Sequence, residues 1–202
     1  MDSMEIETLS AEDEQKRLRV VEGATRVFLA YGYRRTTMDD IAQAAEMSRP
    51  ALYLVFRNKA DIYRAIGERL FHSCATGVDA IMAGDEPLGP RMYRAIEEGM
   101  LTMMGMITAS PHGAELLDLK NELAVGMLEH WHELVSQTFC NAIKRETAAT
   151  GVNLAERGLS AEWLAEMLLD SLEGVKQRTT DPDELRCSAR QLVRVVELAL
   201  KP

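Results

Sequence analysis

The stretch TTMDDIAQAAEMSRPALYLVFRNKADIY, residues 36–63, decides the fold. Nearly every residue in it favours a helix, yet the stretch is too often interrupted to form a single one. Thr37 and Ser48 are of the residue types that cap the N-terminus of a helix. We therefore expect two short helices here, Met38–Ala45 and Arg49–Val55, each beginning just after one of these caps.

The joint between the two short helices is only three residues long, Glu46 to Ser48. Pro50 falls in the first turn of the second helix, where a missing N–H costs little. Helices of about two turns are not stable alone. We expect them to pack against a preceding helix, Gln15–Tyr31, which Gly32 ends as a left-handed cap. Two short helices joined in this way predict a helix-turn-helix, whose second helix fits the major groove of DNA, about 12 Å wide.

The same residues resemble the DNA-binding signature of the TetR family of transcriptional repressors. The matching residues, within 18–65, are Gly32-Tyr33, Thr36-Thr37, Ile41-Ala42, Met47-Ser48, Leu52-Tyr53, Phe56 and Lys59. Two positions depart from the signature. Glu46 replaces the usual turn glycine, and Val55 replaces the usual aromatic residue or histidine. Glu46 is expected to weaken the local attraction for phosphate.

The resemblance implies a set of DNA contacts. Those that read bases are Arg49, Pro50 and Ala51, and those that bind phosphates are Thr37, Ser48, Tyr53 and Lys59. Arg49 is the candidate for a guanine, because its planar fork of donors matches the O6 and N7 atoms of that base. The phosphate contacts fix the register without reading sequence. For Tyr53 a half-buried packing role, and for Lys59 a solvated helix start, are the alternatives.

Charge is unevenly distributed along the chain. The net charge of −9 alone argues against a nucleic-acid partner. Residues 14–69, however, carry eleven Lys and Arg against seven Asp and Glu, which gives +4. Residues 1–13 carry five acids and no base, and residues 70–202 carry twelve basic against twenty acidic residues, which gives −8. A basic N-terminal third on an acidic remainder is compatible with DNA binding confined to that third.

The remaining sequence predicts helices throughout, so the expected fold class is all-α. A three-helix helix-turn-helix domain over 14–66 is joined to a larger helical ligand-binding and dimerisation domain over 67–202. Residues 1–13 are expected to be a disordered acidic tail. Hydrophobic spacing at i, i+3 and i+4 places the later helices. They are expected at about 59–83, 90–108, 111–119, 121–149, 160–178 and 182–200.

The last two expected helices each carry an apolar stripe, which suggests a dimer interface. The stripe residues are Leu164, Met167, Leu168, Ser171 and Val175 on one helix, and Leu185, Ala189, Leu192 and Val196 on the other. Two such helices from each subunit would form a four-helix bundle about a two-fold axis. An ordinary internal core is the alternative, and the resemblance to the TetR family favours the homodimer.

The middle region contains many methionines, which line adaptable apolar sites. By resemblance, this region implies a small-molecule cavity, with Met100, Met103, Met104 and Trp131 as the candidate lining residues. Plain core packing is the alternative for each of them. The effector is unknown, and the acidic balance of the region hints only weakly at cations.

Other chemistries lack a sequence signal. His130 and His132 lie two apart on a helix and point in different directions, so no metal site is expected. No cofactor and no catalytic residues are expected, because no phosphate loop, nucleophile elbow or Cys/His dyad occurs. The three cysteines are expected to be reduced, and no run of apolar residues is long enough to span a membrane. A cytoplasmic location follows.

The sequence thus favours a homodimeric repressor that a small molecule releases from a palindromic DNA operator. Two alternatives remain open. One is a small-molecule sensor or carrier that acts through a protein partner, and the other is a DNA-binding regulator without a ligand. Activation in place of repression is also open, because it depends on where the operator lies relative to the promoter.

Overall fold

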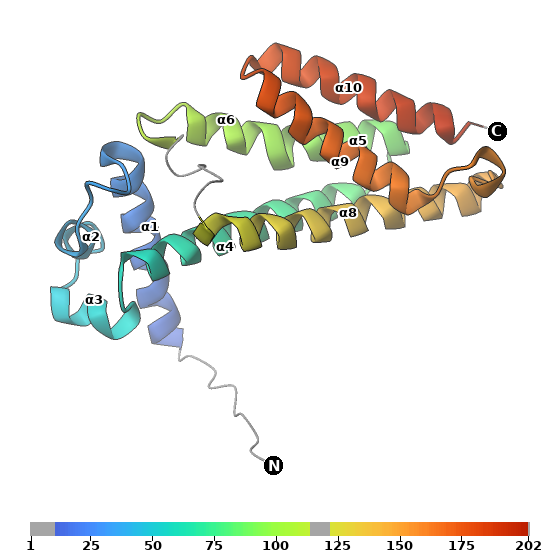
Figure 1. The fold of residues 1–202 in the computed structure, drawn as a ribbon. Helices are drawn as coiled ribbons and strands as arrows, with labels where there is room; N and C mark the ends of the chain where they lie inside the picture. The colour runs from blue at the N-terminus through green and yellow to red at the C-terminus, as the bar shows by residue number, and fades with distance from the viewer. Residues whose placement is uncertain (1–10, 114–121, 202) are drawn as a thin grey trace. The chain divides into compact units, whose positions relative to one another are not determined.

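A computed structural model describes residues 11–113 and 122–201, and all the regular elements in these ranges are helices (Figure 1). In the first part of the chain they are α1 (Ala11–Tyr31), α2 (Met38–Ala44), α3 (Arg49–Val55), α4 (Lys59–Met82), α5 (Leu88–Ile96), the π-helix η1 (Glu97–Leu101) and α6 (Thr102–Thr108). Then come α8 (Glu122–Thr150), the short 3₁₀ helix η2 (Ala155–Arg157), α9 (Ala161–Arg178) and α10 (Pro182–Ala199). The all-α prediction is confirmed for the described residues.

The chain forms two compact units. The described part of the first is 11–69 with 108–113 and 122–124, and that of the second is 70–107 with 125–201. The sequence suggested a single division near residue 66. It gave no sign that residues 108–113 return to the first unit, where the His112 N–H donates to the Leu29 carbonyl oxygen at 3.3 Å.

The first unit packs α2 and α3 against α1 (Figure 1). Each helix contributes fully buried side chains, namely Val20, Ala24 and Phe28 from α1, Ile41 from α2 and Leu52 from α3. Since short helices have little stability of their own, this shared core is what holds them in place.

α1 ends as the sequence predicts but begins earlier. Gly32 has φ 88° and donates its N–H to the Phe28 carbonyl oxygen, as expected of a left-handed cap. At the other end, residues 11–13 form the first turn of α1 instead of belonging to the tail. Its acidic residues, Glu12, Asp13 and Glu14, lie at the positive end of the helix dipole, and Glu12 also pairs with Lys16 at 2.8 Å.

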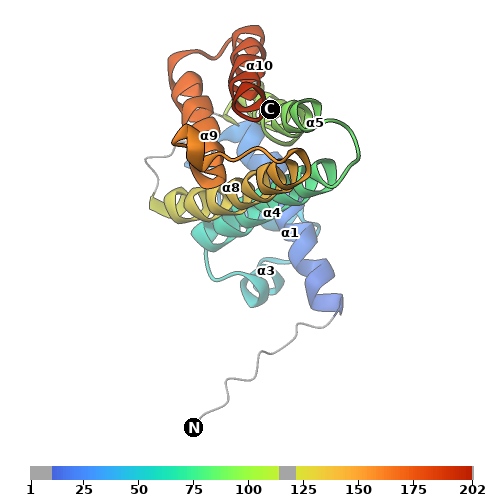
Figure 2. The ribbon, with the colours of Figure 1, turned by 90° about the vertical axis from the view of Figure 1, so that its right-hand side faces the viewer.

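The second unit has its own apolar core, to which α4, α5, α8, α9 and α10 all contribute. Its largest fully buried side chains are Met82, Met92, Ile96, Phe139, Ile143, Leu164, Leu168 and Leu172. α10 packs against both α5 and α9, as Figure 2 shows. Among the described residues, no helix is both long and apolar enough to cross a membrane.

One helix expected at 90–108 is in fact three segments, because the π-helix Glu97–Leu101 interrupts it. Gly99 lies at its centre, and a Cβ atom there would meet Val78 Cγ2 at 2.8 Å. The Cys74 thiol donates to the Gly99 carbonyl oxygen at 2.9 Å. The close approach of α4 to this turn is a tertiary contact, which hydrophobic spacing cannot reveal. The helix expected at 111–119 lies almost entirely outside the described residues.

Candidate nucleic-acid interface

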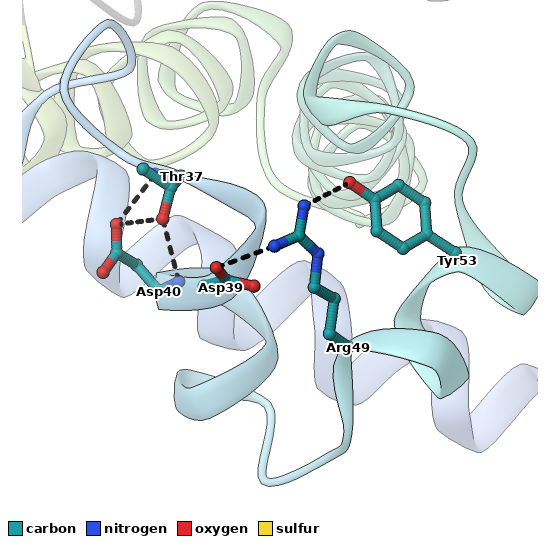
Figure 3. Close-up of polar contacts among 5 residues, drawn as sticks. All are labelled: Thr37, Asp39, Asp40, Arg49 and Tyr53. Carbon is teal, nitrogen blue, oxygen red and sulfur yellow. Dashed lines mark hydrogen bonds and ion pairs between the residues drawn. The ribbon is translucent and has the colours of Figure 1, made fainter.

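A capping box fixes the start of α2 (Figure 3). The Thr37 hydroxyl accepts the Asp40 N–H at 3.2 Å, and the Asp40 carboxylate accepts the Thr37 N–H at 2.8 Å. It also accepts the Thr37 hydroxyl proton at 2.7 Å. The hydrogen bond from the Thr37 hydroxyl, and to a lesser degree the one from its backbone N–H, holds the pKa of Asp40 below its usual value. Thr37, predicted to bind phosphate, is exposed at the start of this helix.

The turn between α2 and α3 keeps the left-handed backbone that the usual glycine would adopt. Glu46 has φ 54°, and within the described residues it is the single non-glycine residue with positive φ. Ser48 then caps α3 by accepting the Ala51 N–H at 3.3 Å. The turn therefore forms with glutamate in place of glycine, at a cost in backbone strain.

α3 presents one exposed face. Leu52 is fully buried, whereas Arg49, Pro50 and Tyr53 are exposed and Ala51 is partly exposed. The three residues predicted to read bases thus lie together in the first turn of α3. Tyr53 keeps 42% of its surface exposed, which leaves it accessible to a phosphate.

Leu54 is a surface residue that the sequence reasoning missed. It is 89% exposed, near the C-terminal end of α3. The signal was available, because Leu52 and Phe56 are the inward residues of the same segment and Leu54 lies between them. An exposed leucine here offers apolar contact to a thymine methyl group or a sugar.

Arg49 is held between two side chains (Figure 3). Its Nη1 donates to Asp39 Oδ2 at 2.9 Å, and its Nη2 lies 3.5 Å from the Tyr53 hydroxyl. The Arg49 guanidinium carbon lies 5.6 Å from the centre of the Tyr53 ring. The hydrogen bond with Tyr53 and the charge of Asp39 raise the pKa of Arg49 above its usual value.

Lys59 is bound to the loop before α2. Its ammonium donates to the carbonyl oxygens of Tyr33 at 2.6 Å and Thr36 at 2.8 Å, with that of Arg34 at 3.4 Å. It also lies 4.5 Å from the centre of the Tyr33 ring. An ammonium has three N–H donors, and these carbonyls account for them. The geometry shows that Lys59 holds this loop in place. To bind a phosphate as predicted, its ammonium would have to give up its hydrogen bond to one of these carbonyl oxygens.

Comparisons with known proteins agree with this geometry. The model of the family of bacterial regulatory proteins named tetR matches residues 20–66. TtgR, an HTH-type transcriptional regulator of Pseudomonas putida, is 27% identical over an alignment 183 positions long, and the match covers 80% of this chain and 85% of TtgR. Residues 20–66 are thus a DNA-binding domain of the TetR family.

Two further matches cover different shares of the chain. YhgD of Bacillus subtilis (strain 168), an uncharacterized HTH-type transcriptional regulator, is 30% identical over 83 residues, so the match spans 43% of YhgD and 41% of this chain. The structure of SmeT, the repressor of the Stenotrophomonas maltophilia multidrug efflux pump SmeDEF, has a TM-score of 0.62 and 19% identity. It covers 91% of this chain and 89% of SmeT, and at this identity it supports the fold alone.

The residues predicted to form the dimer interface divide into a buried group and a partly exposed group. Leu164, Leu168, Ala189 and Val196 are buried in the second unit's own core. Met167, Ser171, Val175, Leu185 and Leu192 are partly exposed. The sequence stripe therefore includes the inward face of each helix, because hydrophobic spacing identifies buried positions whether the partner is in the same chain or in another.

The most exposed large apolar residues of α9 and α10 are not among those predicted. Trp163 is 52% exposed, and Val195 and Leu198 are each 50% exposed. The exposed residues Cys187 and Gln191 precede Val195 on α10 at four-residue spacing, so they share its side of that helix. On α9, Met167 follows Trp163 by four residues in the same way.

Of the predicted ligand residues, Met100 is buried and Trp131 is 7% exposed. The Trp131 ring lies against Phe71, with 6.0 Å between the ring centroids. Its indole N–H is buried and has no hydrogen-bond partner among the described residues. The side chains of Met103 and Met104 lie outside the part of the chain that the structure describes. In the same part, no group of three or more His, Cys, Asp or Glu is placed to hold a metal ion.

Proposed function

We propose that this protein is a homodimeric repressor of the TetR family that binds a palindromic DNA operator through α3 and is released by a small molecule. The observation that carries the DNA-binding part is the exposed first turn of α3, where Arg49, Pro50 and Ala51 lie side by side. Two copies related by a two-fold axis place two such helices in successive major grooves, about 34–36 Å apart.

The homodimer rests on the exposed apolar residues of the last two helices. Trp163, Val195 and Leu198 are each at least half exposed. Large apolar side chains exposed on two adjacent helices are typical of an interface between subunits. A two-fold axis would bring the same stripes of a second copy onto them and form a four-helix bundle. Partly exposed Met167 and Leu192 border these stripes.

The effector part rests on Trp131. A buried N–H without a partner costs about 1–3 kcal/mol, so an acceptor supplied by a ligand would be favourable there. The Phe71 ring beside Trp131 supplies an apolar wall. These surroundings favour an apolar or aromatic small molecule that carries a hydrogen-bond acceptor as the effector.

The DNA-binding part is tested by selection from random-sequence duplex DNA, followed by fluorescence-anisotropy titration of the selected site at two salt concentrations. A palindrome bound by two subunits, with an affinity that falls steeply as salt rises, is the expected result. Arg49→Ala should weaken this binding by about 1–3 kcal/mol if Arg49 reads a guanine. Recovery of no preferred palindrome would reject the repressor function and favour action through a protein partner.

The effector part is tested by thermal unfolding of the wild type and of Trp131→Phe with a panel of aromatic and apolar compounds. The phenylalanine variant keeps an aromatic ring and removes the N–H donor. Compounds that carry a hydrogen-bond acceptor should raise the melting temperature of the wild type more than that of the variant, and should release DNA. A panel that shifts neither protein would favour a DNA-binding regulator without a ligand.

A further inference from the structure

The two acids in the first turn of α2 have different partners. Asp40 forms the capping box with Thr37 and needs nothing more to hold the helix start. Asp39 takes no part in the cap and instead accepts Arg49 Nη1 at 2.9 Å. Its partner is ten residues away, on α3, so the ion pair joins the two helices of the helix-turn-helix across their turn (Figure 3).

The Asp39 contact restricts what Arg49 can do. A guanidinium carries five N–H donors in a fixed plane. Asp39 engages Nη1 on one side, while Tyr53 lies beside Nη2 on the other. A side chain fixed at both ends loses less conformational freedom when it pairs with a base than a freely rotating arginine does. Donors are left over, because each of Nη1 and Nη2 carries two hydrogens.

The Asp39 charge also changes how Arg49 responds to DNA that lacks its base. An arginine without a carboxylate partner is attracted to any phosphate, whatever the sequence. Paired with Asp39, Arg49 belongs to a neutral unit, and the carboxylate itself repels phosphate. Only a guanine has acceptors at both O6 and N7. Hydrogen bonds from the guanidinium to these two atoms offset the lost attraction to phosphate.

We propose that Asp39 is a specificity-determining residue, which holds Arg49 in a reading position and makes its contribution to binding depend on the base it meets. This inference rests on the proposed function, because it requires that Arg49 reads DNA. In this role Asp39 lowers the affinity for random sequence and preserves the affinity for the operator.

The test uses the full-length protein and the site returned by the random-sequence selection. Dissociation constants are measured for three kinds of duplex. These are the selected site, a series of sites in which its guanines are substituted one at a time, and random sequence. The variants are Asp39→Asn, Arg49→Ala and the double variant. Glu68→Gln is the matched control, because Glu68 is also an exposed acid of the first unit and has no contact with Arg49 in the structure.

For Asp39→Asn we expect tighter binding to random DNA and about a tenfold smaller preference for the site over its guanine-substituted version, the size of one base contact. In the Arg49→Ala background, Asp39→Asn should leave that preference unchanged. Glu68→Gln should keep the full preference. Melting temperatures should match the wild type, since an exposed ion pair adds little stability.

Two results would overturn the proposal. One is an unchanged guanine preference in Asp39→Asn, which would make the pair a plain surface contact. The other is a changed preference at a neighbouring base with the guanine preference intact, which would mean that Asp39 itself reads a base. Failure of the wild type to select any site is a separate outcome, which rejects the repressor function and this inference with it.

Discussion

At the scale of single residues, the turn between α2 and α3 carries the clearest local cost. Glu46 adopts φ 54°, a conformation that a side chain with a Cβ atom disfavours by about 1–2 kcal/mol. The surrounding helices impose it, because α2 and α3 are both anchored in the core through Ile41 and Leu52. A residue that glycine would suit better is therefore held in place by tertiary packing.

Glu46→Gly should raise the free energy of unfolding by about 1 kcal/mol, because glycine adopts a positive φ without the Cβ clash. Chemical denaturation of the purified protein measures this change. Glu46→Ala is the matched control, since it removes the same charge and keeps the Cβ atom. Equal stabilisation by both substitutions would show that charge, and not backbone conformation, is responsible.

The cysteines should differ in reactivity. Burial raises the pKa of the Cys74 thiol to about 11, and its Sγ donates to the Gly99 carbonyl oxygen. At pH 8 this group is therefore a neutral thiol, and only thiolates react rapidly with alkylating agents. Cys187 is exposed. Mass spectrometry after brief alkylation should find Cys187 modified and Cys74 intact, with Cys74 reacting only after unfolding. Modification of Cys74 in the folded protein would contradict this assignment.

At the scale of elements, α2 is positioned by a close approach to α1. A Cβ atom at Gly23 would lie 2.9 Å from the backbone of Ala44 and Ala45, at the end of α2. Arg26, one turn further along α1, donates to the Ala44 carbonyl oxygen at 2.9 Å. The C-terminal end of α2 thus rests directly on the backbone of α1.

Gly23→Ala should destabilise the protein by about 1–3 kcal/mol, because it forces backbone apart in a packed core. It should also weaken operator binding, since α2 sets the position of α3. Gly77→Ala is the matched control. Gly77 lies inside α4, and a Cβ atom added there would meet nothing within 4 Å, so alanine should stabilise by up to about 1 kcal/mol. Thermal unfolding of both variants compares the effects, and a neutral Gly23→Ala would mean that α1 and α2 can separate freely.

Local chemistry made much of this arrangement predictable. Thr37 and Ser48 were recognisable as caps from the sequence, and both begin their helices as predicted. What escaped prediction depends on contacts between distant residues. The pairing of Asp39 with Arg49, the carbonyls around Lys59 and the π-helix at Glu97–Leu101 each require knowing which backbone or side chain lies opposite.

At the scale of the whole molecule, the function that we propose depends on a second copy. One recognition helix covers too little DNA to specify a site among the many competing sequences of a genome. The exposed apolar residues of α9 and α10, Trp163, Val195 and Leu198, are the surface through which we propose that the two copies associate. Each substitution at a two-fold interface is present twice, so its effect is amplified.

A variant with Val195→Glu and Leu198→Glu should be monomeric, because it places four carboxylates at the apolar interface of the proposed dimer. Analytical ultracentrifugation measures the mass of the particle in solution. The affinity for the operator should decrease when the dimer is lost. Leu54→Glu is the matched control, as Leu54 is 89% exposed on α3, where we expect loss of DNA binding with the dimer intact. A dimeric double variant would place the subunit contact elsewhere.

The acids around the recognition helix bear on how the regulator finds its target. Asp39 lies in the first turn of α2 and pairs with Arg49, which we propose reads the DNA, and Glu46 lies in the turn that follows α2. A genome offers about 10⁶–10⁹ wrong positions for each right one. A surface that adheres weakly to wrong positions leaves more of the population free in solution at any moment. Such a regulator can occupy its operator with few copies per cell, because little of it is lost to random sequence.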